Sequence, residues 1–308
     1  MKKNIKIFLI LSDSRSGSTF LANSIIEKLG TLVLPETNFI TRLLQADNNT
    51  FSSKKILINF LYQEKKFYDL KIKKKELLNN LTDLRSIKKI VLEILDIYYK
   101  KNNGSNQYVG IKKGSSLYFL DQIMNLFPKT KILNIIRDSR GVYNSKKKSI
   151  YSHTNTYFLR NPFLAAKIWN EKIDIILQSK KKYKAGIFMY EEMIQNLDNT
   201  LYKISNILNL KIKKNNFLKI RKKYYVSNLY HGQLHNNIRL EPDVANIEKW
   251  KNNLSSSEIF CLEFFTKKNL LKFNYKLVNE PKTMINYASI IIFFLKYIFS
   301  KFKKIKLI

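Results

Sequence analysis

The segment Ile5–Gly30, "IKIFLILSDSRSGSTFLANSIIEKLG", constrains the fold more than any other part of the chain. Its apolar run Ile5–Leu11 has strand character and leads into a Gly/Ser turn. The helical pattern Ser18–Leu29 follows the turn directly. A strand, a glycine turn and a helix in this order present consecutive backbone N–H groups at the helix N-terminus, where anions bind. The segment therefore predicts an anion-binding loop in a parallel α/β fold.

The rest of the chain repeats the alternation of strands and helices. Four more short apolar runs lack a polar alternation, as expected of strands buried on both faces: Thr31–Leu34, Gln107–Ile111, Lys131–Ile136 and Gly186–Met189. Helical patterns lie at Ser18–Leu29, Asp83–Lys101, Leu117–Phe127, Pro162–Lys181, Glu191–Leu208 and Ser257–Leu270. We expect a three-layer α/β fold with a central, mostly parallel sheet, a P-loop-like phosphate-binding loop and helical insertions. One domain is predicted over 1–280, with a basic, apolar helix or tail over 281–308.

The 308 residues carry a formal net charge of +33, which attracts phosphates, anionic lipids or nucleic acid. Enrichment in Lys, Asn and Ile, the residues of AT-rich codons, is an alternative cause of this charge. We expect no specific nucleic-acid partner. The single cysteine, Cys261, excludes an internal disulfide and is predicted to be a core residue. No His or Cys cluster has metal-ligand spacing, so no metal is expected.

The two ends of the chain bear on its location. Residues 1–4 run directly into the first strand without a signal-peptide pattern, so we expect a cytoplasmic enzyme. The segment Ile285–Phe299, "INYASIIIFFLKYIF", is shorter than the roughly 20 apolar residues of a membrane span. Two interpretations remain open for it: an interfacial helix on the anionic inner face of the membrane, or a final helix docked on the domain.

The turn "DSRSGST" differs from an ATP-binding P-loop, which follows G-x-x-x-x-G-K-[ST]. Ser12 stands in place of the first glycine and Ser18 in place of the lysine, while the cation has moved to Arg15. This pattern argues against a magnesium-dependent kinase or NTPase. The residues predicted to hold the anion are Arg15, Ser16, Gly17, Ser18 and Thr19. The alternative is an ordinary strand–turn–helix with a capping serine.

A second motif, "KILNIIRDSRGVYNS", places Arg137 at the end of a buried strand and Ser145 on the following helix. Ligands of open α/β sheets bind outside the carboxyl ends of the strands, so Arg137 is expected to face the same crevice as the first loop. An arginine and a helix-borne hydroxyl can hold a second phosphate. The alternative for Arg137 is an ion pair with Asp138 or another acid.

Together these motifs resemble those of the sulfotransferases that use 3′-phosphoadenosine 5′-phosphosulfate (PAPS), in particular the bacterial and carbohydrate-type branch. "SRSGSTFL" is similar to their 5′-phosphosulfate loop, and "IIRDSRGVYNS" is similar to their 3′-phosphate motif, with Ser139 in place of the usual proline. The resemblance covers about residues 5–277. It implies PAPS as co-substrate and transfer of a sulfuryl group to an acceptor hydroxyl.

Weaker similarities lie further along the chain. "GIKKG" carries Lys112 at the family's lysine position, without the usual proline after it, and "MYEEM" resembles a Tyr-Glu-Asp-Leu element. "HGQLHNNIRLEP" retains the arginine, Arg239, of a loop that would close over the 3′-phosphate, but it has His235 for Gly and Asn237 for Pro. "IEKWKNNLS" resembles the Trp-Arg-x-x-Leu segment that follows this loop.

The resemblance suggests roles for the candidate residues. Arg15 would contact the phosphosulfate, Arg137 and Ser145 the 3′-phosphate, and Lys112 either the sulfate or merely the strand end. Glu36, just after the second strand, is the predicted base, as in carbohydrate sulfotransferases. The rival candidates for the base are the three histidines of the chain, His153, His231 and His235.

A carbohydrate or glycolipid acceptor is favoured, because no histidine lies near Gly110, where phenol-sulfating relatives would show one. A protein tyrosine also remains open as acceptor. Two alternative functions are a P-loop nucleotide kinase and a non-catalytic basic protein that binds membrane or nucleic acid.

Overall fold

The computed structural model describes residues 5–46, 51–151, 156–213, 243–278 and 283–305. At its centre is a five-stranded sheet in the order β2-β3-β1-β4-β7, and all neighbouring strands are parallel. The strands are β1 (Lys6–Ser12), β2 (Leu32–Val33), β3 (Tyr108–Lys112), β4 (Lys131–Ile136) and β7 (Gly186–Met189). After β1 the chain continues to β2 and β3 on one side of β1, and β4 and β7 then form on its other side. The direction of the connections thus reverses between β1 and β4, and open α/β sheets bind ligands at such a point.

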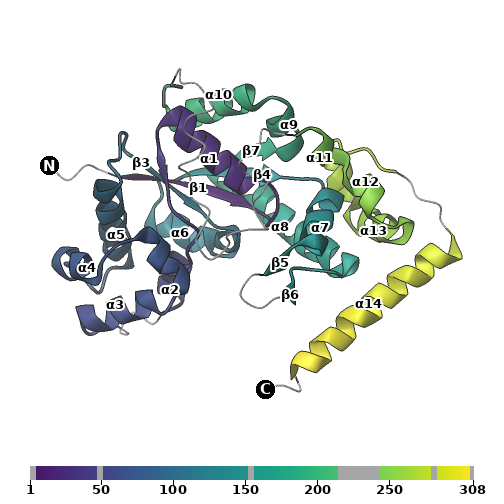
Figure 1. The fold of residues 1–308 in the computed structure, drawn as a ribbon, viewed down its shortest axis with the longest axis horizontal. Helices are drawn as coiled ribbons and strands as arrows, with labels where there is room; N and C mark the ends of the chain where they lie inside the picture. The colour runs from purple at the N-terminus through teal and green to yellow at the C-terminus, as the bar shows by residue number, and fades with distance from the viewer. Residues whose placement is uncertain (1–4, 47–50, 152–155, 214–242, 279–282, 306–308) are drawn as a thin grey trace.

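Helices cover both faces of the sheet (Figure 1). Alternate residues of β1 point to opposite layers: Phe8 and Ile10 pack with α1, α9 and α10, whereas Leu9 and Leu11 pack with the helices of the other face. The first layer consists of α1 (Ser18–Leu29), α9 (Tyr190–Gln195) and α10 (Leu197–Leu208). The second layer includes α5 (Ile87–Lys101), α6 (Leu120–Leu126), preceded by the 3-10 helix η2 (Gly114–Phe119), and α8 (Pro162–Tyr183). The expected three-layer α/β fold is therefore confirmed.

A helical insertion separates β2 from β3 and packs against the second layer (Figure 1, lower left). It comprises α2 (Phe39–Gln45), α3 (Lys54–Tyr62), the 3-10 helix η1 (Lys65–Leu70) and α4 (Lys74–Asn80), and it ends in α5. Apolar side chains from every one of these elements join the core cluster. The insertion is thus part of the domain and not a separate unit.

The segments after β4 build the other side of the molecule. They are α7 (Ser139–Lys148), an antiparallel hairpin of β5 (Ile150–Tyr151) and β6 (Thr156–Tyr157), α11 (Ala245–Glu248), α12 (Trp250–Asn253), α13 (Ser256–Lys272) and α14 (Met284–Ile305). The last helix, α14, contacts α8 and α13. Among the described residues, no helix is both long enough and apolar enough to cross a membrane.

All five predicted strands are present, and Cys261 is buried in α13 as expected. Three predicted helices differ from the structure. The pattern Asp83–Lys101 is helical only from Ile87, after the N-cap residue Ser86. The pattern Leu117–Phe127 begins earlier, as the 3-10 turn η2, and Glu191–Leu208 is divided at Asn196. The Asn196 side chain accepts a hydrogen bond from the backbone N–H of Asn199 at 3.0 Å and so caps a new helix. The proposed boundary between a domain over 1–280 and a tail remains a prediction.

Candidate active site

The loop between β1 and α1 has the backbone of an anion-binding turn. Gly17, the N-cap residue of α1, has φ 84°, and Arg15 has φ 70°, a conformation that residues with a side chain rarely adopt. No side chain in the described part of the chain caps α1. The first N–H groups of this 12-residue helix therefore remain available to an anion.

Gly17 is also required for a close contact. A Cβ atom at this position would lie 2.6 Å from the ring of Tyr190, the first residue of α9. Tyr190 belongs to the "MYEEM" motif, and its ring also lies 4.1 Å from the guanidinium of Arg137. This ring joins the two motifs, so a larger residue at Gly17 would disturb both.

The two phosphate motifs meet through direct hydrogen bonds. The Nε of Arg15 donates to the hydroxyl of Ser145 at 3.0 Å, and Nη1 of Arg137 donates to the carbonyl oxygen of Arg15 at 2.9 Å. Burial and the neighbouring Arg137 charge lower the pKa of Arg15. Two cations held this close repel each other, and an anion between them would relieve the repulsion. The structure thus gathers the residues expected to bind the 5′ and 3′ ends of the donor.

The backbone at Arg137 is held from two sides. The indole N–H of Trp169 donates to the Arg137 carbonyl oxygen at 2.9 Å, and the N–H of Asp138 donates to the Glu191 carboxylate at 3.1 Å. Burial raises the pKa of Glu191, against the hydrogen bond it accepts from Tyr275. These contacts fix where the Arg137 side chain leaves β4.

The suggested ion pair between Arg137 and Asp138 is not formed. Asp138 instead accepts hydrogen bonds from Arg140, with a shortest distance of 2.6 Å. Within the described residues no carboxylate lies within 4.0 Å of Arg137, and its buried Nε has no hydrogen-bond partner there. A buried, unsatisfied guanidinium N–H fits a phosphate ligand, because leaving such a group unpaired costs free energy.

On the other side of β1, Lys112 connects the helix start to the predicted base. Its amino group, at the end of β3, donates to the carboxylate of Glu36 at 2.7 Å and to the hydroxyl of Thr19 at 2.8 Å. Burial favours the neutral acid, but the charges of Lys112 and Lys113 outweigh it and lower the pKa of Glu36 to about 2. Glu36 is therefore ionised at neutral pH, with 34% of its side chain still exposed.

The surroundings of Glu36 are polar and charged. Lys113, Lys66 and Glu64 all interact electrostatically within this region. Burial lowers the pKa of Lys113, and its lysine neighbours lower it further, while the two carboxylates oppose the shift. The predicted base thus lies among charged side chains.

The structure adds one ionic cluster that the sequence did not suggest. Asp13, the first residue of the loop, is buried between Lys146 of α7 at 2.5 Å and Lys172 of α8 at 2.6 Å. Burial raises the pKa of Asp13, but the two lysines outweigh it and lower it overall. The cluster attaches the loop to the helix that carries Ser145. The sequence offers one signal for this ionic cluster, namely that Asp13 directly follows β1 and begins the loop motif.

Comparison with known proteins identifies the family. The model of a family described as "Sulfotransferase family" matches residues 8–214, more than half of the chain. The chain belongs to the sulfotransferase family. No curated protein matches it.

Two solved structures share the fold of this sulfotransferase. The sulfotransferase domain from the curacin biosynthetic pathway is 18% identical, with a TM-score of 0.60, covering 89% of this chain and 99% of that one. The sulfotransferase domain of the Synechococcus PCC 7002 olefin synthase is 20% identical, with a TM-score of 0.56, covering 89% and 97%. At these identities the likeness concerns the fold alone.

Of the predicted site residues of this sulfotransferase, the structure gathers those around the ends of β1, β3 and β4, namely Arg15, Ser16, Gly17, Ser18, Thr19, Glu36, Lys112, Arg137 and Ser145. Arg239 and the rival bases His153, His231 and His235 lie outside the described residues. Within the described ranges, no group of three or more His, Cys, Asp or Glu side chains is placed to hold a metal ion.

Proposed function

We propose that this sulfotransferase transfers the sulfuryl group of PAPS to a hydroxyl group of a carbohydrate, either free or as the head group of a glycolipid. One observation carries the proposal: the Arg15–Ser145 hydrogen bond of 3.0 Å joins the phosphosulfate loop to the 3′-phosphate motif. A donor with phosphates at both ends suits this arrangement, because each motif would hold one of them.

The donor would lie across the carboxyl ends of β1 and β4. The N–H groups at the start of α1, with Arg15, would hold the phosphosulfate. Arg137 and Ser145 would hold the 3′-phosphate. Arg239, outside the described residues, is a further candidate for that phosphate. The buried Nε of Arg137 and the uncapped α1 both accommodate an anion. This donor set makes no use of a metal.

In the transfer step the acceptor oxygen forms a bond to sulfur, and the bond from sulfur to the bridging phosphate oxygen breaks. The electron pair of that bond leaves with 3′,5′-ADP. Glu36 takes the hydroxyl proton as general base. Lys112 stands between Thr19 and Glu36, so it can turn toward negative charge that develops on the sulfuryl oxygens or the leaving group.

The acceptor class is argued from the region around Glu36. Its lysines and carboxylates offer hydrogen bonds to a polyhydroxylated ligand. The helical insertion follows Glu36 directly in the chain and brings Lys66 into electrostatic interaction with Glu36, and Glu64 into electrostatic interaction with Lys113. A polar lining favours a sugar over a phenol, whose ring would require an apolar pocket.

Labelled PAPS incubated with the purified protein and a cell extract tests this proposal. We expect label in a carbohydrate or lipid-extractable glycan that glycosidases release. Label in protein tyrosine would contradict the acceptor class while leaving the donor intact. Binding of ATP and Mg²⁺ with no affinity for 3′,5′-ADP, measured by calorimetry, would contradict the donor and favour the nucleotide kinase.

A further inference from the structure

The last helix, α14, is docked on the domain through polar groups and aromatic rings. The hydroxyl of Ser257 donates to the Asn286 side chain at 3.1 Å and receives a hydrogen bond from Ser289 at 3.1 Å. Further along, the Asn161 side chain donates to the carbonyl oxygen of Phe293 at 2.8 Å. Aromatic rings contribute to the docking as well: Phe294 and Tyr297 pack on Phe163, and Tyr287 packs on Phe260. A surface helix ordinarily has one apolar stripe, which faces the core, whereas α14 carries apolar residues both at its contact with the domain and away from it.

A second set of apolar side chains of α14 forms a stripe that the domain leaves exposed. The exposed fractions of its members run from 44% for Leu295 to 89% for Met284. The members recur at helical spacing, and we call them the outer stripe: Met284, Ile285, Ile291, Ile292, Leu295 and Phe299. Between 284 and 299 the only charged residue in the sequence is Lys296. An apolar surface of this length on a single helix marks an interaction site.

Charge indicates what covers the outer stripe. A second copy of the chain would bring two bodies of +33 together, and that repulsion opposes a dimer. An anionic lipid surface attracts the same charge, and the sequence after Phe299, "SKFKKIKLI", adds lysines at the end of the helix. The helix is not apolar enough to cross a bilayer, so it would lie in the plane of the interface.

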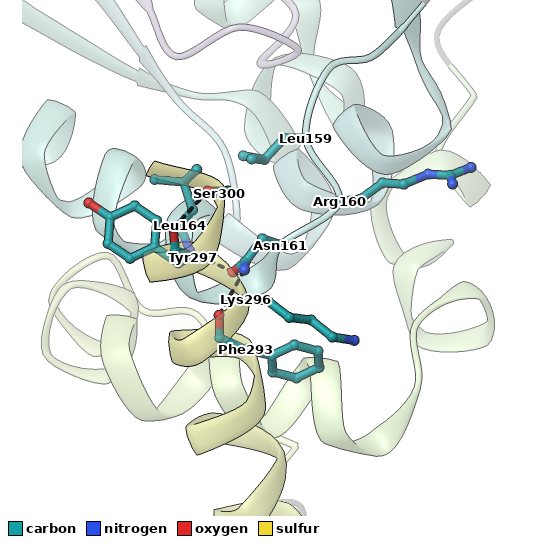
Figure 2. Close-up of a pocket in the computed structure, with 8 residues that line it drawn as sticks. All are labelled: Leu159, Arg160, Asn161, Leu164, Phe293, Lys296, Tyr297 and Ser300. Atoms are coloured by element: carbon teal, nitrogen blue, oxygen red, sulfur yellow. Dashed lines mark hydrogen bonds between the residues drawn. The ribbon is translucent and has the colours of Figure 1, made fainter. Parts of the chain in front are cut away.

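Basic groups also lie beside the helix. A cavity of about 380 Å³ lies between α14 and the segment 159–164. Arg160 and Lys296 are among the residues that line it (Figure 2). Leu164 and Phe293 contribute apolar surface to the same cavity. Lys296 lies on α14 itself and directly follows Leu295 of the outer stripe, and a cation beside apolar residues matches a phospholipid, whose phosphate lies next to its acyl chains.

We propose that α14 docks this protein on an anionic bilayer surface, with the outer stripe inserted at the level of the head groups. The 22-residue helix, rising about 1.5 Å per residue, would lie along the membrane over roughly 33 Å. This inference goes beyond the proposed function and depends on neither the donor nor the acceptor.

The test uses flotation of the full chain with vesicles of phosphatidylcholine alone or mixed with phosphatidylglycerol. We expect binding to the mixed vesicles that weakens as salt is raised, and little binding to the neutral ones. Leu295→Glu should weaken binding at least about 10-fold, because burying one leucine contributes roughly 1.5–3 kcal/mol. The matched control is Leu78→Glu on α4, a leucine with the same 44% exposure at a distance from α14 (Figure 1), and it should bind like the wild type.

Three results would overturn the proposal: equal binding to neutral and anionic vesicles, no binding to either, or unchanged binding of Leu295→Glu. A dimer seen by light scattering that Leu295→Glu converts to a monomer would also overturn it, because a second copy would then cover the stripe. Thermal unfolding of both variants checks that they are folded. Vesicle binding needs no sulfate transfer, so its failure would leave the proposed enzymatic function untouched.

Discussion

The amino group of Lys112 lies 2.7 Å from a carboxylate oxygen of Glu36, although 76 positions separate the two residues. Because the same amino group also donates to Thr19, it ties the predicted base to the first turn of α1. A carboxylate with a pKa of about 2 is a weak base at neutral pH. For Glu36 to act as the proposed base, Lys112 would have to shift its hydrogen bonds away from this carboxylate, and substitutions of either residue test this proposal.

The first prediction concerns Glu36→Gln. We expect donor binding close to that of the wild type and a fall in kcat of about 10²–10⁴-fold, the usual contribution of a general base. Calorimetry with 3′,5′-ADP and single-turnover transfer of labelled sulfate measure the two effects. Asp121→Asn, which alters a surface carboxylate on α6, is the control and should leave both unchanged. Retained turnover in Glu36→Gln would exclude Glu36 as the base.

The second prediction concerns pH and stability. The pKa of Glu36 is lowered from 4.5 to about 2 in the folded protein, so the pair stabilises the fold above pH 4.5. This stabilisation is lost as pH falls from 4.5 toward 2. Removing the cation in Lys112→Met should raise the pKa of Glu36 and cost about 1–3 kcal/mol at pH 7, between the values of surface and buried pairs.

Denaturant unfolding of the wild type and Lys112→Met across this pH range measures the effect. The stability difference between the two proteins should narrow below pH 4.5, because protonated Glu36 no longer needs its partner. A difference that stays constant with pH would show that the ion pair does not carry it. Lys100→Met, which removes a lysine from an exposed pair with Asp96, is the matched control and should change stability by less than about 1 kcal/mol.

Much of the architecture follows from short local patterns. The five strands are continuous apolar runs, and parallel strands bring their carboxyl ends to one edge, so the sequence alone predicts that Arg15, Glu36, Lys112 and Arg137 lie close together. The Arg15–Ser145 hydrogen bond links residues 130 positions apart, yet each belongs to a recognisable strand–turn–helix. Local chemistry thus determines where the candidate site lies.

The contacts that support the site could not be predicted in the same way. Asp13 pairs with Lys172 across 159 positions, and Arg140 pairs with Glu263 across 123. In a chain with 56 Lys and Arg residues, no sequence pattern indicates which of them forms an ion pair with a given buried carboxylate. For α14, apolar residues occur on most sides of the helix, so the sequence does not determine which side docks. These choices depend on packing between distant elements.

A third prediction addresses the donor site. Arg15→Ala and Arg137→Ala should each weaken binding of 3′,5′-ADP or PAPS beyond detection, a loss of at least about 100-fold, because each would remove charge-assisted hydrogen bonds worth about 1.5–3 kcal/mol apiece. Calorimetry at several salt concentrations is the measurement. Arg42→Ala, which affects a guanidinium over the ring of Phe60 in the insertion, is the control and should bind the donor normally. Normal donor affinity in Arg137→Ala would remove it from the site.

The last prediction separates the two arginines of "RDSR". Arg140 is buried, holds Asp138 at 2.6 Å and also pairs with Glu263, whereas Arg137 has no carboxylate partner among the described residues. Arg140→Ala would leave two buried carboxylates uncompensated and should reduce the free energy of unfolding by about 3–5 kcal/mol. Arg137→Ala should change it by less than about 1 kcal/mol while eliminating donor binding. Urea unfolding of both variants gives the comparison, and a large loss of stability in Arg137→Ala would show that its buried guanidinium supports the fold instead of the donor.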